Sequence, residues 1–194
     1  QSKKDFDQDP VLLRMQVQLK KSGIKIENIK NIDLSWSIVD ISRNLKQYTS
    51  GEYILIFPFC SKKHIKKKWP YYKELVKSLK TLYKNKYSIL IAPGPGEVEE
   101  ADKYNAKIVL DDGSPVNLNF LISLINGSQF IISNDTGPAH ISSHLNMKGL
   151  ALFGSHTSPK KVSMENTNFK TLSVKDLKDL DVNTVLKRVK ELLY

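Results

Sequence analysis

The chain has 194 residues, of which 40% are hydrophobic and 26% are charged. This length fits one large domain or two small ones, and the composition excludes collagen-like, coiled-coil and disordered classes. Thirty Lys and Arg against twenty Asp and Glu give a net charge of +10. Such an excess favours a polyanionic partner: nucleic acid, nucleotide phosphates or an anionic membrane surface.

A single cysteine, Cys60, excludes an intrachain disulfide and favours a reducing compartment, so we expect a cytoplasmic protein. No apolar run approaches the roughly 20 residues that a membrane-spanning helix needs. The chain opens at Gln1, its methionines are Met15, Met147 and Met164, and its polar first residues do not resemble a signal peptide. We therefore expect it to be part of a longer chain.

The segment before Tyr53 differs from the rest of the sequence. Helical spacing of apolar residues is confined to 11–20, where Asp9 and Pro10 predict a capping residue and a first-turn proline. The remainder of this segment is polar and poorly periodic. We interpret residues 1–51 as an interdomain or N-terminal remnant and residues 52–194 as the folded domain.

From Tyr53 onward, short apolar runs alternate with amphipathic ones. Strands are predicted over 53–59, 88–92, 107–110, 129–133, 149–153 and 169–172, and helices over 71–83, 97–104, 117–126, 138–145 and 182–193. The strands are too uniformly apolar to face water. The sequence therefore predicts an α/β fold, a Rossmann-like parallel sheet with helices on both faces.

Ligands of such sheets bind beyond the carboxyl ends of the strands. The candidate rim is formed by the loops that start at Pro58, Pro93, Asp111, Asn134 and Gly154.

The strongest local signal is the run 131–140, Ile-Ile-Ser-Asn-Asp-Thr-Gly-Pro-Ala-His. An apolar strand ends in a polar turn, and a helix then begins at Pro138. The free N–H groups and positive dipole end of that helix predict an anion site. Asp135 and Thr136 either cap the helix or bind a ligand hydroxyl.

Lysines gather between the first strand and the next helix. They could neutralise a diphosphate as point charges, and the alternative for most of them is a solvated loop. The five are Lys62, Lys63, Lys66, Lys67 and Lys68. Trp69 is interpreted as a packing anchor at the start of the helix.

The turn 93–97, Pro-Gly-Pro-Gly-Glu, differs from a dinucleotide fingerprint because Glu99 replaces the third glycine. This excludes nicotinamide binding. The carboxylate of Glu97 or Glu100 could accept hydrogen bonds from ribose hydroxyls, and surface helix charge is the alternative.

His140 and His144 stand four residues apart on one helix, but no third ligand accompanies them, so we expect no metal site. His140 is better suited to a phosphate or capping contact. His156 and Thr157 lie on another rim loop, where turn structure is the alternative.

The run 134–140, followed by Ala-Leu-Phe-Gly at 151–154, resembles the signature of glycosyltransferase family nine, the lipopolysaccharide heptosyltransferases. Lys-Lys-Trp-Pro at 67–70 and Gly-Pro-Gly-Glu at 94–97 support the resemblance, which extends from about Tyr53 to the C-terminus.

This resemblance implies the C-terminal half of a GT-B glycosyltransferase that binds a nucleotide-diphosphate sugar, typically ADP-heptose. The family inverts the anomeric centre without a metal, and no cofactor is expected. The donor-binding residues it implies are Lys67 for the diphosphate, Thr136 and Gly137 for phosphate, Asp135 for sugar hydroxyls, Glu97 for the ribose, and His140 as a donor-site contact.

Family members carry an N-terminal acceptor domain that supplies the catalytic carboxylate. Only about fifty residues precede Tyr53 here, so the resemblance leaves the base unassigned and places it outside this chain. The loop 61–66 is also longer and more basic than the family pattern. The resemblance implies a lipid-linked saccharide acceptor and peripheral contact with an anionic inner membrane.

Two other functions stay open at this point. The net charge allows a nucleic-acid-binding module, although no helix-turn-helix or RNP-like signature is present and no nucleic-acid partner is expected. A nucleotide-sugar epimerase would share the GT-B layout and a diphosphate pocket, and the run 135–140 argues against it.

Overall fold

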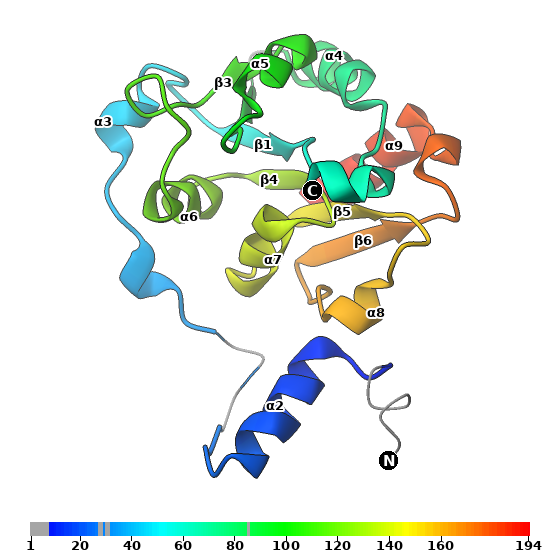
Figure 1. The fold of residues 1–194 in the computed structure, drawn as a ribbon. Helices are drawn as coiled ribbons and strands as arrows, with labels where there is room; N and C mark the ends of the chain where they lie inside the picture. Colours follow the sequence, from blue (N-terminus) through cyan, green and yellow to red (C-terminus); the bar gives the residue numbers. More distant parts are fainter. Residues whose placement is uncertain (1–7, 27–28, 30–31, 85) are drawn as a thin grey trace.

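The computed structural model describes residues 8–26, 29, 32–84 and 86–194. Its centre is a six-stranded sheet in the order β3-β2-β1-β4-β5-β6, in which all neighbouring strands are parallel (Figure 1). The strands are β1 (Tyr53–Phe57), β2 (Ser88–Ile91), β3 (Lys107–Ile108), β4 (Phe130–Asn134), β5 (Gly149–Phe153) and β6 (Phe169–Ser173). The predicted Rossmann-like fold is confirmed.

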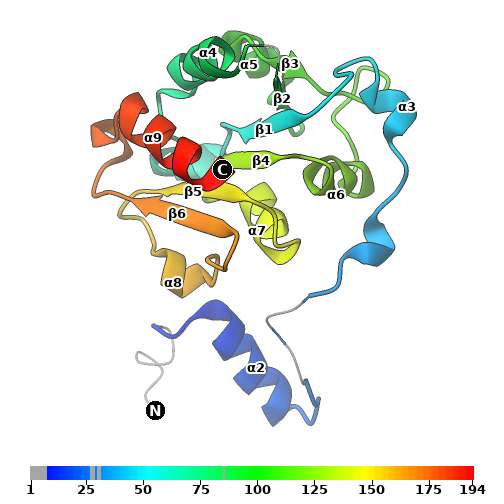
Figure 2. The ribbon, with the colours of Figure 1, turned by 180° about the vertical axis from the view of Figure 1, so that it is seen from behind.

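Helices cover both faces of this sheet, as Figure 2 shows from behind. The helices are α2 (Val11–Lys21), η1 (Ser35–Ser37), α3 (Ser42–Leu45), η2 (Lys62–Lys67), α4 (Tyr72–Tyr83), α5 (Val98–Ala101), η3 (Asp102–Tyr104), α6 (Leu118–Asn126), α7 (Gly137–His144), α8 (Pro159–Val162), η4 (Leu177–Asp179) and α9 (Val182–Leu193).

Strand β1 shows how the sequence divides the core between the two faces. Because side chains alternate along a strand, Ile54 and Ile56 pack with α4 and α9, whereas Leu55 and Phe57 pack with α6 and α7. All four side chains are buried, so this strand has no solvent-facing side. Uniformly apolar strands are typical of a parallel sheet between two helical layers.

The strand order places a topological switch point beside β1. The chain leaves β1 toward β2 on one side, and β4 pairs with β1 on the other side. The connections that follow β1 and β4 therefore run to opposite faces of the sheet. A crevice for a ligand is expected between two such connections, at the carboxyl ends of the strands.

Several boundaries differ from those predicted. β1 ends at Phe57 because Pro58 has no N–H to donate to a neighbouring strand. The segment predicted as a loop after β5 contains the short helix α8, which begins at Pro159 and is capped by Ser158 through the Lys161 N–H. The expected Asp9 cap of α2 is wrong, since Pro10 itself occupies the N-cap position and no side chain caps the helix.

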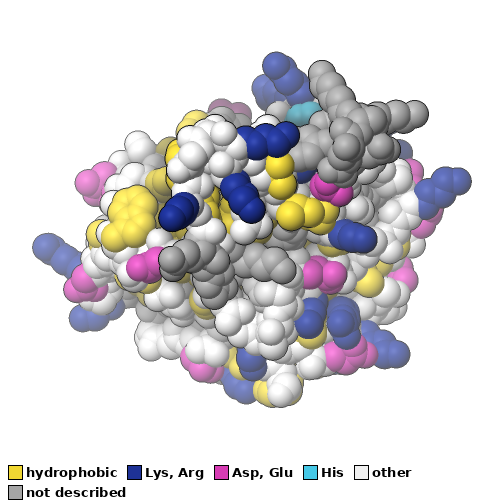
Figure 3. All heavy atoms as spheres, turned by 90° about the horizontal axis from the view of Figure 1, so that it is seen from below, with side chains coloured by type: hydrophobic (Ala, Val, Ile, Leu, Met, Phe, Trp, Pro, Cys, Tyr) yellow, Lys and Arg dark blue, Asp and Glu magenta, His cyan; other side chains and the backbone are white. Residues whose placement is uncertain are grey.

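Helix α2 lies apart from the sheet and buries none of its residues (Figure 1). Its backbone reaches the rest of the protein where the Leu12 N–H donates to Ser163 Oγ over 3.4 Å. Figure 3 shows hydrophobic side chains among lysines and arginines on the face seen from below. A division of the chain at residues 51 and 52 stays a prediction, and residues 1–7, 27–28 and 30–31 of the first part lie outside the described residues.

Within the described ranges, none of the helices combines the length and the apolar character needed to cross a bilayer.

Candidate functional site

Lys67 and Asp135 meet at the switch point. Lys67 is the last residue of η2, which follows β1, and Asp135 directly follows β4. The Lys67 ammonium donates to Asp135 Oδ2 over 2.6 Å and to the Asp135 main-chain carbonyl over 3.3 Å. The Asp135 side chain is only 2% exposed, whereas that of Lys67 is 25% exposed. A lysine that is both anchored and open to solvent is therefore available at the crevice.

The Asp135 carboxylate is held in its charged form. Burial alone would raise its pKa, but His140, Lys67 and His156 outweigh burial and hold the pKa well below its ordinary value. His140 Nε2 lies 3.7 Å from Oδ1, and His156 Nε2 lies 3.0 Å from Oδ2. The carboxylate is thus surrounded by the protein's own donors. A direct contact of Asp135 with sugar hydroxyls stays a prediction.

The N-terminus of α7 lies next to this pair. Thr136 occupies the N-cap position, but its side chain makes no capping hydrogen bond, so the simple capping interpretation does not describe it. Gly137 is exposed, and a Cβ placed on it would meet no atom within 4 Å. Nothing in the protein itself therefore requires glycine at this position. A bare helix start at the crevice suits close approach of an anion.

Asn134 joins the two sides of the switch point, a role that the sequence did not reveal. Its buried side chain accepts from the main-chain N–H of Trp69 over 3.1 Å and from the Tyr72 hydroxyl over 3.2 Å. It donates to the main-chain carbonyl of Phe59 over 3.2 Å. Trp69 is 1% exposed and packs edge-on against Tyr72. The interpretation of Trp69 as a packing anchor is confirmed, and Asn134 fixes the end of η2 relative to α7.

The turn after β2 holds Glu97 by its own backbone. The Gly94 N–H donates to Glu97 Oε2 over 2.7 Å, and Gly96 takes the left-handed conformation at φ 77°. Partial burial raises the pKa of Glu97, against the opposing effect of this hydrogen bond. The carboxylate thus has a fixed position at the rim. Its contact with a ribose stays a prediction.

Glu100 has a structural partner instead. Its carboxylate forms an ion pair with Lys68 and accepts from the Tyr104 hydroxyl over 3.0 Å. Of the five clustered lysines, Lys67 and Lys68 form ion pairs within the described residues, whereas Lys62, Lys63 and Lys66 are exposed on η2. The structure thus separates two paired lysines, of which Lys67 lies at the switch point, from three lysines on an exposed surface.

The two histidines of α7 point to different surroundings. His140 faces Asp135, whereas His144 lies at the far end of the helix, where burial and nearby His140 lower its pKa. Among the described residues, no three His, Cys, Asp or Glu side chains form a group that could hold a metal ion.

His156, which the sequence placed on a rim loop with turn structure as the alternative, contacts Asp135. It lies between β5 and α8, and its Nε2 contacts the same Asp135 oxygen as Lys67 does. Its position after Gly154 on a rim loop was the available signal. The loops after three different strands therefore converge on one buried carboxylate.

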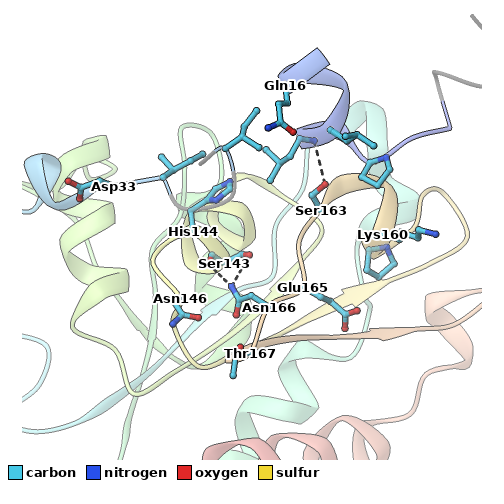
Figure 4. A pocket seen from close by; sticks show the side chains of 16 residues that line it. Gln16, Asp33, Ser143, His144, Asn146, Lys160, Ser163, Glu165, Asn166 and Thr167 are labelled. Carbon is cyan, nitrogen blue, oxygen red and sulfur yellow. Dashed lines mark hydrogen bonds between the residues drawn. The ribbon is translucent and has the colours of Figure 1, made fainter. Parts of the chain in front are cut away.

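A cleft of about 1150 Å³ lies elsewhere, between α2 and the segment around α7 and α8 (Figure 4). His144, Ser163 and Asn166 are among its lining residues, whereas Lys67, Glu97 and Asp135 are not. This cleft is therefore separate from the switch point at which Lys67 and Asp135 meet.

A positioned lysine beside a bare helix start, at the switch point of a Rossmann-like sheet, is suited to an anion. A family model described as glycosyltransferase family 9 (heptosyltransferase) matches residues 2–189. The chain belongs to this family.

Solved structures with the same fold include Escherichia coli heptosyltransferases. WaaC with ADP-2-deoxy-2-fluoro heptose is 18% identical with a TM-score of 0.62, covering 92% of this chain and 54% of WaaC. ADP-heptose lps heptosyltransferase II is 20% identical with a TM-score of 0.62, covering 84% and 52%. A UDP-GlcNAc 2-epimerase from Methanocaldococcus jannaschii is 14% identical with a TM-score of 0.62, covering 95% and 54%.

The chain spans about half the length of these structures. No curated protein matches it.

Proposed function

We propose that this chain is the donor-binding part of an inverting glycosyltransferase of lipopolysaccharide core synthesis. The donor that it binds is a nucleotide-diphosphate sugar, ADP-heptose. The observation that carries the proposal is the position of the Lys67 ammonium beside the start of α7, 2.6 Å from a buried carboxylate. A diphosphate needs several donors in one place, and an ammonium with adjacent backbone N–H groups meets that need.

Each of the donor-binding residues has a proposed role. Lys67 binds the diphosphate, and Thr136 and Gly137 bind phosphate through a hydroxyl and a backbone N–H. Glu97 binds the ribose from the turn after β2, and His140 contacts the donor from α7. Asp135 binds sugar hydroxyls through its less occupied oxygen, Oδ1, whose neighbour His140 lies 3.7 Å away.

We assign no catalytic base within the described residues. Transfer to a hydroxyl needs a base within hydrogen-bond reach of that hydroxyl. Asp135 and Glu97 are assigned above to the donor, and Asp111 accepts from Asn44 over 3.2 Å. The proposal therefore places the base in an acceptor-binding domain outside this chain. The acceptor it supposes is a lipid-linked saccharide, reached by a cytoplasmic enzyme at the inner membrane surface.

The epimerase similarity gives a second candidate, because the M. jannaschii protein shares the fold at the same TM-score. The family match favours the glycosyltransferase. A nucleic-acid module has only the net charge of +10 in its support, and charge is the least specific of these features.

Calorimetric titration with ADP and with UDP separates these candidates. We expect saturable binding of ADP at one site, with UDP weaker by about tenfold or more. Equal or tighter binding of UDP would favour the epimerase-like alternative. Absence of saturable ADP binding, together with steeply salt-dependent binding of duplex DNA, would favour the nucleic-acid alternative.

A further inference from the structure

His156 contacts Asp135 at the proposed donor site, and the function proposed above gives His156 no role. We infer that His156 is a positioning residue: it holds the Asp135 carboxylate, which in turn holds the Lys67 ammonium toward a bound diphosphate. This inference rests on the proposed donor site and adds to it a residue from the loop after β5.

The hydrogen bond of His156 defines which ring nitrogen carries the proton. Its Nε2 lies 3.0 Å from Asp135 Oδ2, and this carboxylate is ionised. An ionised carboxylate only accepts hydrogen bonds, so Nε2 must donate. The opposite nitrogen, Nδ1, is buried and has no hydrogen-bond partner in the described part of the chain. The ring therefore has one polar contact, and it is directed at Asp135.

Packing fixes the ring in this orientation. The imidazole stacks on the buried Phe153 ring, with centroids 6.1 Å apart and an interplanar angle of 9°. A Cβ on Gly154 would lie 3.4 Å from Nδ1, at the near limit of van der Waals contact, so the ring lies close against this glycine. The His156 side chain is 14% exposed. A ring held this firmly restricts where the Asp135 carboxylate can lie.

The fixed Asp135 carboxylate holds the Lys67 ammonium in place. Its ammonium has three N–H donors, and two of them reach Asp135, through Oδ2 and the main-chain carbonyl. One donor is then left for a phosphate oxygen. Because His156 donates to the same Oδ2, the oxygen that holds Lys67 is itself held in place.

Substitution of His156 tests this arrangement through ADP affinity. We expect His156→Ala to weaken ADP binding about tenfold. We expect His156→Gln, whose side-chain amide can donate to Asp135, to bind within about threefold of the wild type. His156→Phe keeps a ring on Phe153 but lacks the donor, and we expect it to lose as much affinity as His156→Ala. The exposed His64, replaced by Ala, is the matched control.

A double-mutant cycle with Lys67→Ala separates positioning from general support of the fold. If His156 acts through Lys67, its removal costs no further affinity once Lys67 is absent. Equal losses in both backgrounds, or full affinity in His156→Phe, would overturn the inference. If His156→Ala does not fold, the comparison of the Gln and Phe variants decides in the same way.

A second readout works without nucleotide. In wild type and His156→Gln, a held Lys67 ammonium should give a slowly exchanging Nζ–H signal by NMR, and this signal should disappear in His156→Phe. Its persistence in His156→Phe would overturn the inference. If the wild type binds no ADP, the proposed function fails, and this NMR comparison still decides the role of His156.

Discussion

The Lys67 ammonium lies 2.6 Å from Asp135 Oδ2, joining two rim loops whose residues are 68 positions apart in the chain. Lys67 follows β1 and Asp135 follows β4, so the sheet order brings them together. In this ion pair Asp135 is buried and Lys67 is partly exposed. The carboxylate therefore stays charged, and the lysine keeps its position without a ligand.

Replacement of Lys67 by Ala should weaken ADP binding by about 1 to 3 kcal/mol, the range for loss of a hydrogen bond to a charged group. Lys62→Ala is the matched control, since this lysine is exposed on the same helix η2. Titration calorimetry of both variants gives the comparison. Equal losses at Lys62 and Lys67 would show that overall positive charge, and not one positioned lysine, binds the ligand.

Replacement of Gly137 by Val should weaken ADP binding by about tenfold or more, because a branched side chain would cover the start of α7. The fold should tolerate the change, since a Cβ there meets no atom within 4 Å. Gly51→Val is the control, because its Cβ is equally unhindered and it precedes β1. Unchanged ADP affinity in Gly137→Val would place the phosphate away from this helix.

His144 gives the protein a pH-dependent stability. Burial lowers its pKa in the folded chain, so the unfolded chain takes up the proton first as the pH falls. The stability due to neutral His144 is complete above its ordinary pKa of about 6.5 and is lost as the pH falls below that value. We expect the free energy of unfolding to decrease more between about pH 7 and pH 5 in the wild type than in His144→Gln.

Urea denaturation at each pH measures this difference. Parallel profiles for the wild type and His144→Gln would contradict the assignment.

Removal of divalent metal should leave ADP affinity unchanged, because Lys67 and the start of α7 supply the donors for phosphate. Titration in the presence of EDTA is the measurement. Stoichiometric zinc that survives dialysis and depends on His140 and His144 would show that a metal takes part.

The purified chain should bind donor without transferring sugar, because we assign none of its rim carboxylates as the catalytic base. Donor-dependent glycosylation of a lipid A core acceptor is the assay. Turnover at a rate comparable with that of a two-domain family member would show that the base lies within this chain.

Much of the fold could be predicted from local pattern. The helix over Val182–Leu193 and the strand over Gly149–Phe153 have the predicted bounds, because apolar periodicity and burial coincide there. Helix α8 was missed although Ser158 and Pro159 together form a helix-start signal, since the helix is only four residues long. The Asp9 cap failed because Pro10, and not Asp9, occupies the N-cap position.

The site was predicted only in part, for a physical reason. Motifs identified Lys67 and Asp135 separately, but their contact depends on β4 pairing with β1, which periodicity does not encode. His156 and Asn134 were placed at the rim, but their contacts were not predicted, for the same reason. Their partners lie 21 and more than 60 positions away, on loops that only the folded sheet brings together.

The location of bound ADP tests the account most directly. A crystal structure with ADP should place the diphosphate within about 3 Å of Lys67 Nζ and of the backbone N–H groups that begin α7, with the ribose beside Glu97. A diphosphate bound in the cleft between α2 and α8, or out of reach of Lys67, would contradict the assignment of the crevice as the donor site.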